Sequence, residues 1–316
     1  MRPSALACPA SLKGVLTARA AADALMEGLG AGSLALPVAD GGEGTLDVLY
    51  AALGGEWRHA EVADAFGRPR RARWLLLPDG TAAVESAEAV PFDATRLDAL
   101  GASSRGLGEL IQAVGSPPRL LVGLGGVAVS DGGAGMREVL DELPAPTEAL
   151  CDVLVRLLDA ARLFAPQKGA SPEQVEELVR RLESREDLAP YADLPGAGAA
   201  GALGGALAAL GAQLVPGAER LLELVRLRER LDGASLVVTG EGTVDRTTAE
   251  GKAPGAVARL AAEAGVRCVV FGGRVLEPVE GAETVALSGD PLRAGRDLVA
   301  LGRSLRQLLD SPLGGV

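Results

Sequence analysis

Short apolar runs alternate with helical segments at both ends of the chain, and this order constrains the fold more than any other feature. Residues 4–8 and 33–38 have the length of buried strands, and a helical pattern capped by Thr17 covers 17–29 between them. A strand–helix–strand order is typical of a parallel sheet covered by helices. We therefore predict a doubly wound α/β domain.

The last third of the chain repeats the pattern. Apolar runs at 235–243, 267–273 and 284–288 predict three more strands, and helices are expected over 254–264 and 293–309. With the two N-terminal runs, they make five short strands in one parallel sheet. Ligands of such sheets bind at the carboxyl ends of the strands.

The middle of the chain has a different pattern. Residues 56–64 and 70–77 flank the turn sequence AFGRP, which predicts an antiparallel hairpin, and 119–126 reads as another buried strand. Ser171 and Gln174 form a predicted capping box for a helix.

This change of pattern predicts two domains. A discontinuous α/β domain is expected over 1–55 plus 215–316, and an inserted second α/β domain with antiparallel hairpins over 56–214.

Composition excludes several functions. A net charge of -11 argues against nucleic acid as a partner, because phosphate backbones need a basic face. Cys8, Cys151 and Cys268 have no CxxC spacing, which favours a reducing compartment. No apolar run has the length of a membrane span or signal peptide, so we expect a cytoplasmic protein.

Four glycine-containing turns carry the candidate chemistry. Three of them, 40–45, 125–135 and 240–245, follow predicted strands and contain carboxylates, and 164–170 contains a Lys–Gly pair. Glycine-rich backbone at a helix N-terminus offers N–H donors to phosphate, and carboxylates suit a metal or a base facing a hydroxyl. An ordinary tight turn with acidic caps is the alternative at each position.

Lysine is rare and occurs only beside glycine. The chain has 31 basic residues, of which only Lys13, Lys168 and Lys252 are lysine. A lysine ammonium is a compact charge that arginine does not replace at a tight site, and an adjacent glycine lets backbone approach a ligand. The three positions together indicate function.

Other catalytic arrangements do not fit. His59 is the only histidine, in a predicted hairpin, which argues against a Ser–His–Asp triad and a histidine zinc site. The chain has no P-loop motif, and the GxGxxG match at 196–201 does not follow a clear strand, so it reads as a glycine–alanine helix entry. An acidic, glycine-rich, lysine-containing site fits phosphoryl transfer.

Six segments resemble, in order, the motifs of the glycerate kinase family that combines a flavodoxin-like domain with an inserted second domain. They are 11–18, 37–45, 123–136, 164–170, 195–207 and 239–254. The resemblance implies ATP- and Mg²⁺-dependent phosphorylation of D-glycerate, by metal-assisted in-line transfer at a cleft between the domains.

The resemblance also implies roles for individual residues. Candidate catalytic residues are Asp40, Asp131, Asp245 and Lys13. Candidate nucleotide ligands are Gly41, Gly42, Gly240, Glu241, Gly242 and Lys252. Candidate substrate ligands are Ser11, Lys13, Ser130, Asp131 and Lys168, and candidate metal ligands are Asp40, Glu43 and Glu241.

The sequence departs from the family pattern at several places. Ala10 replaces an aspartate, Thr243 an arginine and Ser130 an asparagine, and the segment before Phe164 is shorter. Two alternatives follow: a kinase for another small hydroxy acid, and a nucleotide-binding relative with a regulatory role. The phosphorylated position, 2 or 3, the identity of the base and a homodimer are left open.

Overall fold

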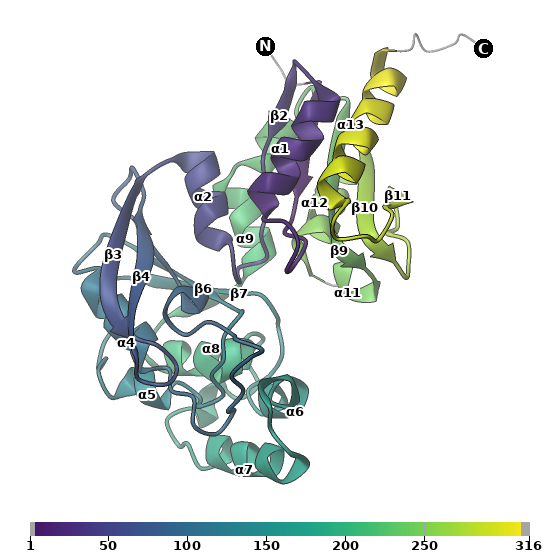
Figure 1. Ribbon diagram of the computed structural model, residues 1–316. Helices are drawn as coiled ribbons and strands as arrows, with labels where there is room; N and C mark the ends of the chain where they lie inside the picture. Colours follow the sequence, from purple (N-terminus) through teal and green to yellow (C-terminus); the bar gives the residue numbers. More distant parts are fainter. Residues whose placement is uncertain (1–3, 250, 311–316) are drawn as a thin grey trace. The chain divides into compact units, whose positions relative to one another are not determined.

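The computed structural model describes residues 4–249 and 251–310 (Figure 1). Their contacts form two compact units. Unit 1 contains the chain up to Ala39, Asp47–Ala52, and the chain from Ala218 onward, and unit 2 contains Asp40–Leu46 and Leu53–Gly217. The predicted domain boundaries stay a prediction, and the contacts group the turn 40–46 with unit 2.

Unit 1 is built on a five-stranded sheet in which every neighbouring pair is parallel. The strand order is β11–β10–β9–β1–β2. Numbered along unit 1, this is the 2-1-3-4-5 order of flavodoxin-like sheets, which confirms the predicted fold class. The strands are β1 (Ala5–Pro9), β2 (Ser33–Ala35), β9 (Leu236–Val244), β10 (Arg267–Val275) and β11 (Glu283–Ala286).

Helices cover both faces of this sheet. On one face, α1 (Ala18–Leu29) and α13 (Ala294–Asp310) bury leucines against Val238, Val269 and Phe271. The other face is covered by α12 (Ala253–Glu263), which packs against the central strands (Figure 1). The predicted cap of α1 is confirmed, since the Thr17 hydroxyl accepts a hydrogen bond from the Ala20 N–H. The remaining helices of this part are α2 (Thr45–Leu53), α9 (Gly217–Leu224), α10 (Leu227–Leu231) and α11 (Arg246–Ala249).

Two glycines let α1 and α13 touch backbone to backbone. A Cβ placed on Gly28 would lie 2.3 Å from the Val299 carbonyl oxygen, and one on Gly302 would lie 2.6 Å from the Leu25 carbonyl oxygen. Neither contact leaves room for a side chain. The helix pair therefore depends on glycine at both positions.

We predict that Gly302→Ala lowers the free energy of unfolding by about 1–3 kcal/mol, the usual cost of overpacking a tight contact. Gly295→Ala is the matched control, because it lies in the same helix and a Cβ there would meet no atom within 4 Å. This control should gain up to about 1 kcal/mol from alanine's helix propensity. Denaturant unfolding measures both, and equal effects would contradict the close-packing explanation.

Unit 2 is built on a mixed six-stranded sheet of order β3–β4–β5–β6–β7–β8. The pairs β3–β4 and β4–β5 are antiparallel, which confirms the predicted hairpin, and the pairs from β5 to β8 are parallel. The strands are β3 (Glu56–Ala63), β4 (Pro69–Leu76), β5 (Ala82–Glu85), β6 (Leu120–Leu124), β7 (Thr147–Cys151) and β8 (Gln213–Pro216).

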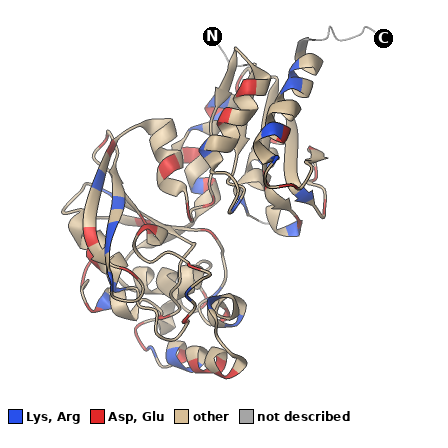
Figure 2. Ribbon diagram, in the orientation of Figure 1, with Lys and Arg blue, Asp and Glu red and all other residues tan. Residues whose placement is uncertain are grey.

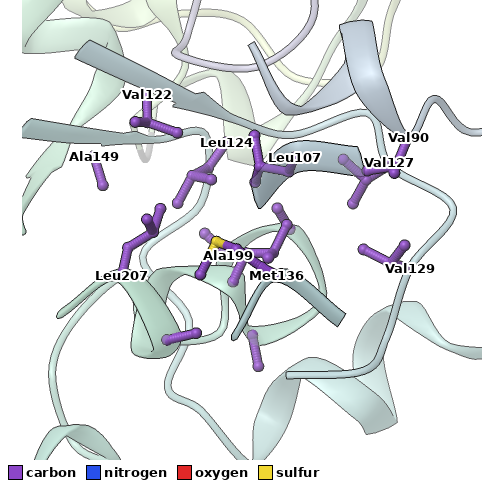
Figure 3. Close-up of a cluster of buried hydrophobic side chains, with 14 of the residues drawn as sticks. Val90, Leu107, Val122, Leu124, Val127, Val129, Met136, Ala149, Ala199 and Leu207 are labelled. Carbon is purple, nitrogen blue, oxygen red and sulfur yellow. The ribbon is translucent and has the colours of Figure 1, made fainter. Parts of the chain in front are cut away.

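The core of unit 2 lies between this sheet and its helices. Figure 3 shows Leu107, Val122 and Met136 within this core, from a helix, a strand and a loop helix. The predicted capping box is confirmed by hydrogen bonds between Ser171 and Gln174 in both directions. The helices are α3 (Ser86–Ala89), α4 (Arg105–Ala113), α5 (Ala134–Arg137), α6 (Asp159–Phe164), η1 (Pro166–Lys168), α7 (Pro172–Glu183), η2 (Ala189–Tyr191) and α8 (Ala199–Ala209).

Membrane-spanning helices were sought in residues 4–249 and 251–310, and no helix there is both long and apolar enough to cross a bilayer. The cytoplasmic location stays a prediction.

Candidate functional site

The glycine turn at 40–46 is held by a buried carboxylate that the sequence analysis missed. Glu85 is the last residue of β5 and is 2% exposed. Its two oxygens accept hydrogen bonds from the Gly44 N–H at 3.1 Å and the Leu46 N–H at 3.2 Å. These N–H groups belong to the start of α2, where an acceptor is needed. In the sequence, Glu85 could have been recognised as an acidic residue at the end of an apolar strand.

This turn contacts the glycine turn that follows β6. A Cβ on Gly125 would lie 2.7 Å from the Gly42 Cα and 2.4 Å from the Asp152 Oδ2. A Cβ on Gly126 would lie 3.2 Å from the Glu43 Cβ. Two predicted turns and the carboxylate that follows β7 therefore meet at one edge of the unit 2 sheet.

The turn itself directs one of its carboxylates. The Gly42 N–H donates to Asp40 Oδ1 at 3.2 Å. A Cβ on Gly41 would lie 2.9 Å from the Leu150 carbonyl oxygen and 2.9 Å from the Gly217 Cα, so this position requires glycine. The exposed Glu43 is the second acidic residue of the turn.

Asp131 organises its own loop. Its Oδ2 accepts from the Ser104 N–H and hydroxyl and from the Gly135 N–H, at 2.9, 2.8 and 3.0 Å, and its Oδ1 accepts from the Gly133 N–H at 3.2 Å. The adjacent Ser130 is 5% exposed. These contacts favour a positioning role for Asp131, whose assignment as a base stays a prediction.

Lys168 is buried beside the same loop. It is 4% exposed, and its Nζ donates to the Val129 carbonyl oxygen. Burial lowers the pKa of this amine to about 8, while the Asp152 and Asp131 carboxylates act in the opposite direction. A predicted substrate ligand therefore has a backbone partner inside unit 2.

We predict a specific pH dependence for Lys168→Met. Between about pH 8 and 10.5 the folded amine has lost its proton while the unfolded amine keeps it, so the unfolded chain binds more protons. The stability of the wild type should therefore rise with pH, relative to the variant, by about 2–3 kcal/mol. Denaturant unfolding from pH 7 to 10 measures this difference, and a constant difference would contradict the lowered pKa.

The glycine–alanine segment in the first turn of α8 packs against this loop as well. Ala200, Gly201 and Ala202 have left-handed backbone, with φ of 52°, 71° and 68°. This conformation is unfavourable for alanine. The Gly132 N–H donates to the Gly201 carbonyl oxygen at 3.2 Å. The segment lies in unit 2 as a strained helix entry.

Unit 1 has its own cluster at the carboxyl end of β9. Glu241 accepts a hydrogen bond from the Thr248 hydroxyl at 2.7 Å, and the Lys252 Nζ lies 3.3 Å from Glu241 and 3.8 Å from Asp245. A hydrogen bond from the Thr247 hydroxyl is the main cause that lowers the pKa of Asp245, with Lys252 contributing. The structure therefore brings together three predicted site residues and adds Thr248.

The turn after β1 lies beside this cluster. The Ala10 N–H donates to the Gly240 carbonyl oxygen at 2.9 Å, and a Cβ on Gly242 would lie 3.9 Å from the backbone nitrogen of Lys13. Ser11 is half-buried and Lys13 exposed. The predicted nucleotide glycines and the first lysine thus belong to adjacent turns.

The neighbouring strand β10 contains a further cation that the sequence analysis did not single out, Arg274. Thr243 lies opposite Arg274 in the β9–β10 register. The sequence signal for Arg274 was the strand ending FGGR. This arginine lies one strand away from Thr243, the position where the family pattern has an arginine.

The donor set fits a nucleotide with Mg²⁺. Magnesium in kinases is bound through one or two carboxylates plus substrate phosphates, so a cage of protein ligands is not required. Within the described residues, no three acidic, histidine or cysteine side chains form a metal cluster. Asp40 and Glu43 share one turn, and Glu241 lies beside Lys252, a suitable phosphate partner.

The basic residues of the β3–β4 hairpin lie outside the candidate site. Figure 2 shows several of them along these two strands. Arg73 pairs with Glu88 at 2.6 Å and lies 4.5 Å from the centre of the Trp57 ring. Arg58 pairs with Glu56 at 2.6 Å. These contacts lie within the hairpin and between the hairpin and α3.

Comparison with known proteins identifies the family. A family model described as "Glycerate kinase family" matches residues 5–145 and 141–289. The chain belongs to the glycerate kinase family. This confirms the resemblance and the prediction of a kinase.

Relatives in the glycerate kinase family match most of the chain. Glycerate 2-kinase of Escherichia coli K12 is 35% identical, with 80% of each chain covered, and glycerate kinase of Bacillus subtilis 168 is 34% identical, with 84% of each covered. A crystal structure described as "putative glycerate kinase 2" from Salmonella typhimurium LT2 has a TM-score of 0.80 at 29% identity and covers 98% of both chains.

Proposed function

We propose that this family member transfers a phosphoryl group from ATP to D-glycerate. The observation that carries the proposal is the 35% identity, over 80% of both chains, to a protein named glycerate 2-kinase. The two site clusters support it, since each contains the carboxylates, glycines and lysine that phosphoryl transfer needs. No covalent nucleophile is required.

Unit 1 would bind the nucleotide phosphates. Lys252 directly precedes α12, so its ammonium and the N–H groups of that helix start offer positive charge to phosphate. Glu241 and Asp245 hold the ammonium in place when phosphate is absent. Gly242 keeps a side chain away from the same place, and Gly240 is required by packing, because a Cβ there would lie 2.1 Å from the Phe271 carbonyl oxygen.

Unit 2 would bind the metal and the acceptor. Asp40 and Glu43 would hold Mg²⁺, which neutralises charge on the transferred phosphoryl group when bound. Ser130 and Asp131 would contact the acceptor. Ser11 and Lys13, the other predicted acceptor ligands, belong to unit 1.

Three more detailed hypotheses from the sequence analysis stay predictions. They are in-line transfer at a cleft between two domains, the choice of base among the carboxylates, and a homodimer.

An acceptor panel tests the proposed function. Purified protein with ATP and Mg²⁺ should release ADP with D-glycerate, and far less with L-glycerate or without acceptor. Faster release with another small hydroxy acid would assign that acid as substrate. Nucleotide binding without turnover on any acceptor would contradict the kinase proposal and favour a regulatory role.

We predict that Lys252→Met lowers kcat/KM by at least about 10²-fold, because it removes a charge that contacts the phosphates. Arg259→Met is the matched control. Arg259 lies on the same helix in an exposed ion pair with Glu219 at 2.7 Å, and such pairs contribute less than about 1 kcal/mol. Steady-state kinetics compares the two variants. Equal activity of both would remove Lys252 from the site.

A further inference from the structure

The contacts of Lys168 differ from those of a substrate ligand. Its amine is 4% exposed at the end of the short η1 helix, and it donates to a main-chain carbonyl, that of Val129. The Val129 side chain lies in the hydrophobic core (Figure 3). A buried lysine whose amine donates to a backbone carbonyl is suited to fixing a loop. It is not suited to binding a ligand that enters from solvent.

Two carboxylates act electrostatically on this amine. The Asp152 carboxylate follows β7 beside Gly125, where the loop 125–135 begins, and the Asp131 carboxylate lies within that loop. Both carboxylates favour the charged amine. Arg185 is the next cation outward, pairs with Asp187, and donates to the Gly132 carbonyl oxygen at 3.4 Å. Lys168 thus donates to the loop that follows β6 and lies in the electrostatic field of the carboxylate that follows β7.

The strained segment contacts the same stretch of loop. A Cβ on Gly201 would lie 2.1 Å from the Val129 carbonyl oxygen and 3.0 Å from the Ser130 Cα. The carbonyl that accepts from Lys168 is therefore also in backbone contact with the left-handed residues in the first turn of α8. Residues 129–132 are held by the amine and by this segment.

We propose that Lys168 is a positioning residue, whose amine holds the Val129 carbonyl and so fixes Ser130 and Asp131 for the acceptor. The inference rests on the proposed function in one respect, the assignment of Ser130 and Asp131 to the acceptor site. Lysine suits the position because its single nitrogen reaches one carbonyl in a space closed by backbone, where a guanidinium fork does not fit.

Hydrogen exchange tests the positioning role without any turnover. In the full-length protein, Lys168→Met should speed exchange in peptides covering 125–135 by about tenfold or more, and leave peptides of α12 unchanged. Val62→Ala is the matched control, because it removes buried volume from β3, the edge strand of the same sheet. It should leave exchange in 125–135 much less affected than Lys168→Met does.

A pH profile of activity supplies the second readout. The wild type should lose kcat above about pH 8, because the neutral amine makes a weaker hydrogen bond to the Val129 carbonyl than the charged amine does. Asp152→Asn removes the main carboxylate that favours the charged amine, so its alkaline limb should move to lower pH. Lys168→Met should have a low kcat without this limb. A variant with altered stability alone would keep the wild-type profile.

Two results would overturn the proposal. Unchanged exchange in 125–135, together with a raised KM for D-glycerate in Lys168→Met, would make Lys168 a direct substrate ligand. An alkaline limb of kcat that stays at the same pH in Asp152→Asn would show that the charge of the amine does not affect the reaction. If Lys168→Met does not fold, the Asp152→Asn variant supplies the test. Because exchange needs no substrate, its result stands even if D-glycerate proves not to be the acceptor.

Discussion

Backbone contact at the carboxyl edge of the unit 2 sheet is the constraint on which the candidate site depends. Gly125 approaches Gly42 and the Asp152 carboxylate so closely that a Cβ would overlap both. Gly41 approaches the Leu150 carbonyl with the same closeness. Parallel strands bring their carboxyl ends to one edge, but only glycine lets the turns that follow touch each other. The turns then pack against each other without a side chain between them.

Buried polar residues hold these turns in place. Glu85 accepts from the first turn, Asp131 from its own loop and from Ser104, and Lys168 donates to Val129. Each side chain supplies a hydrogen-bond partner to backbone groups that would otherwise be buried away from water without one. Burying charge for this purpose lowers stability, as the lowered pKa of Lys168 shows. Such costs are common at functional sites, where geometry matters more than stability.

Local patterns predicted most of the fold. The alternation of strands and helices, the Thr17 cap and the Ser171 capping box correspond to elements found in the structure. These features depend on residues near each other in the chain, so periodicity and capping rules find them.

The site was predictable in part, because its turns carry motifs but its supports do not. Glu85 is 41 residues from Gly44, and the partner of Lys168 is 39 residues away. Contacts between such distant positions arise from tertiary packing, which no local pattern encodes. The left-handed alanines at 200 and 202 are a similar case. Their backbone opposes the preference of alanine and is imposed by neighbouring loops.

The central claim is that this protein makes a phosphate ester of D-glycerate, and ³¹P NMR of the reaction mixture tests it most directly. With ATP, Mg²⁺ and D-glycerate, the γ-phosphate signal should be replaced by one phosphomonoester signal in step with the formation of ADP. Its coupling to the glycerate protons would show whether position 2 or 3 carries the phosphate. Inorganic phosphate in place of the ester, or intact ATP from folded protein, would contradict the account.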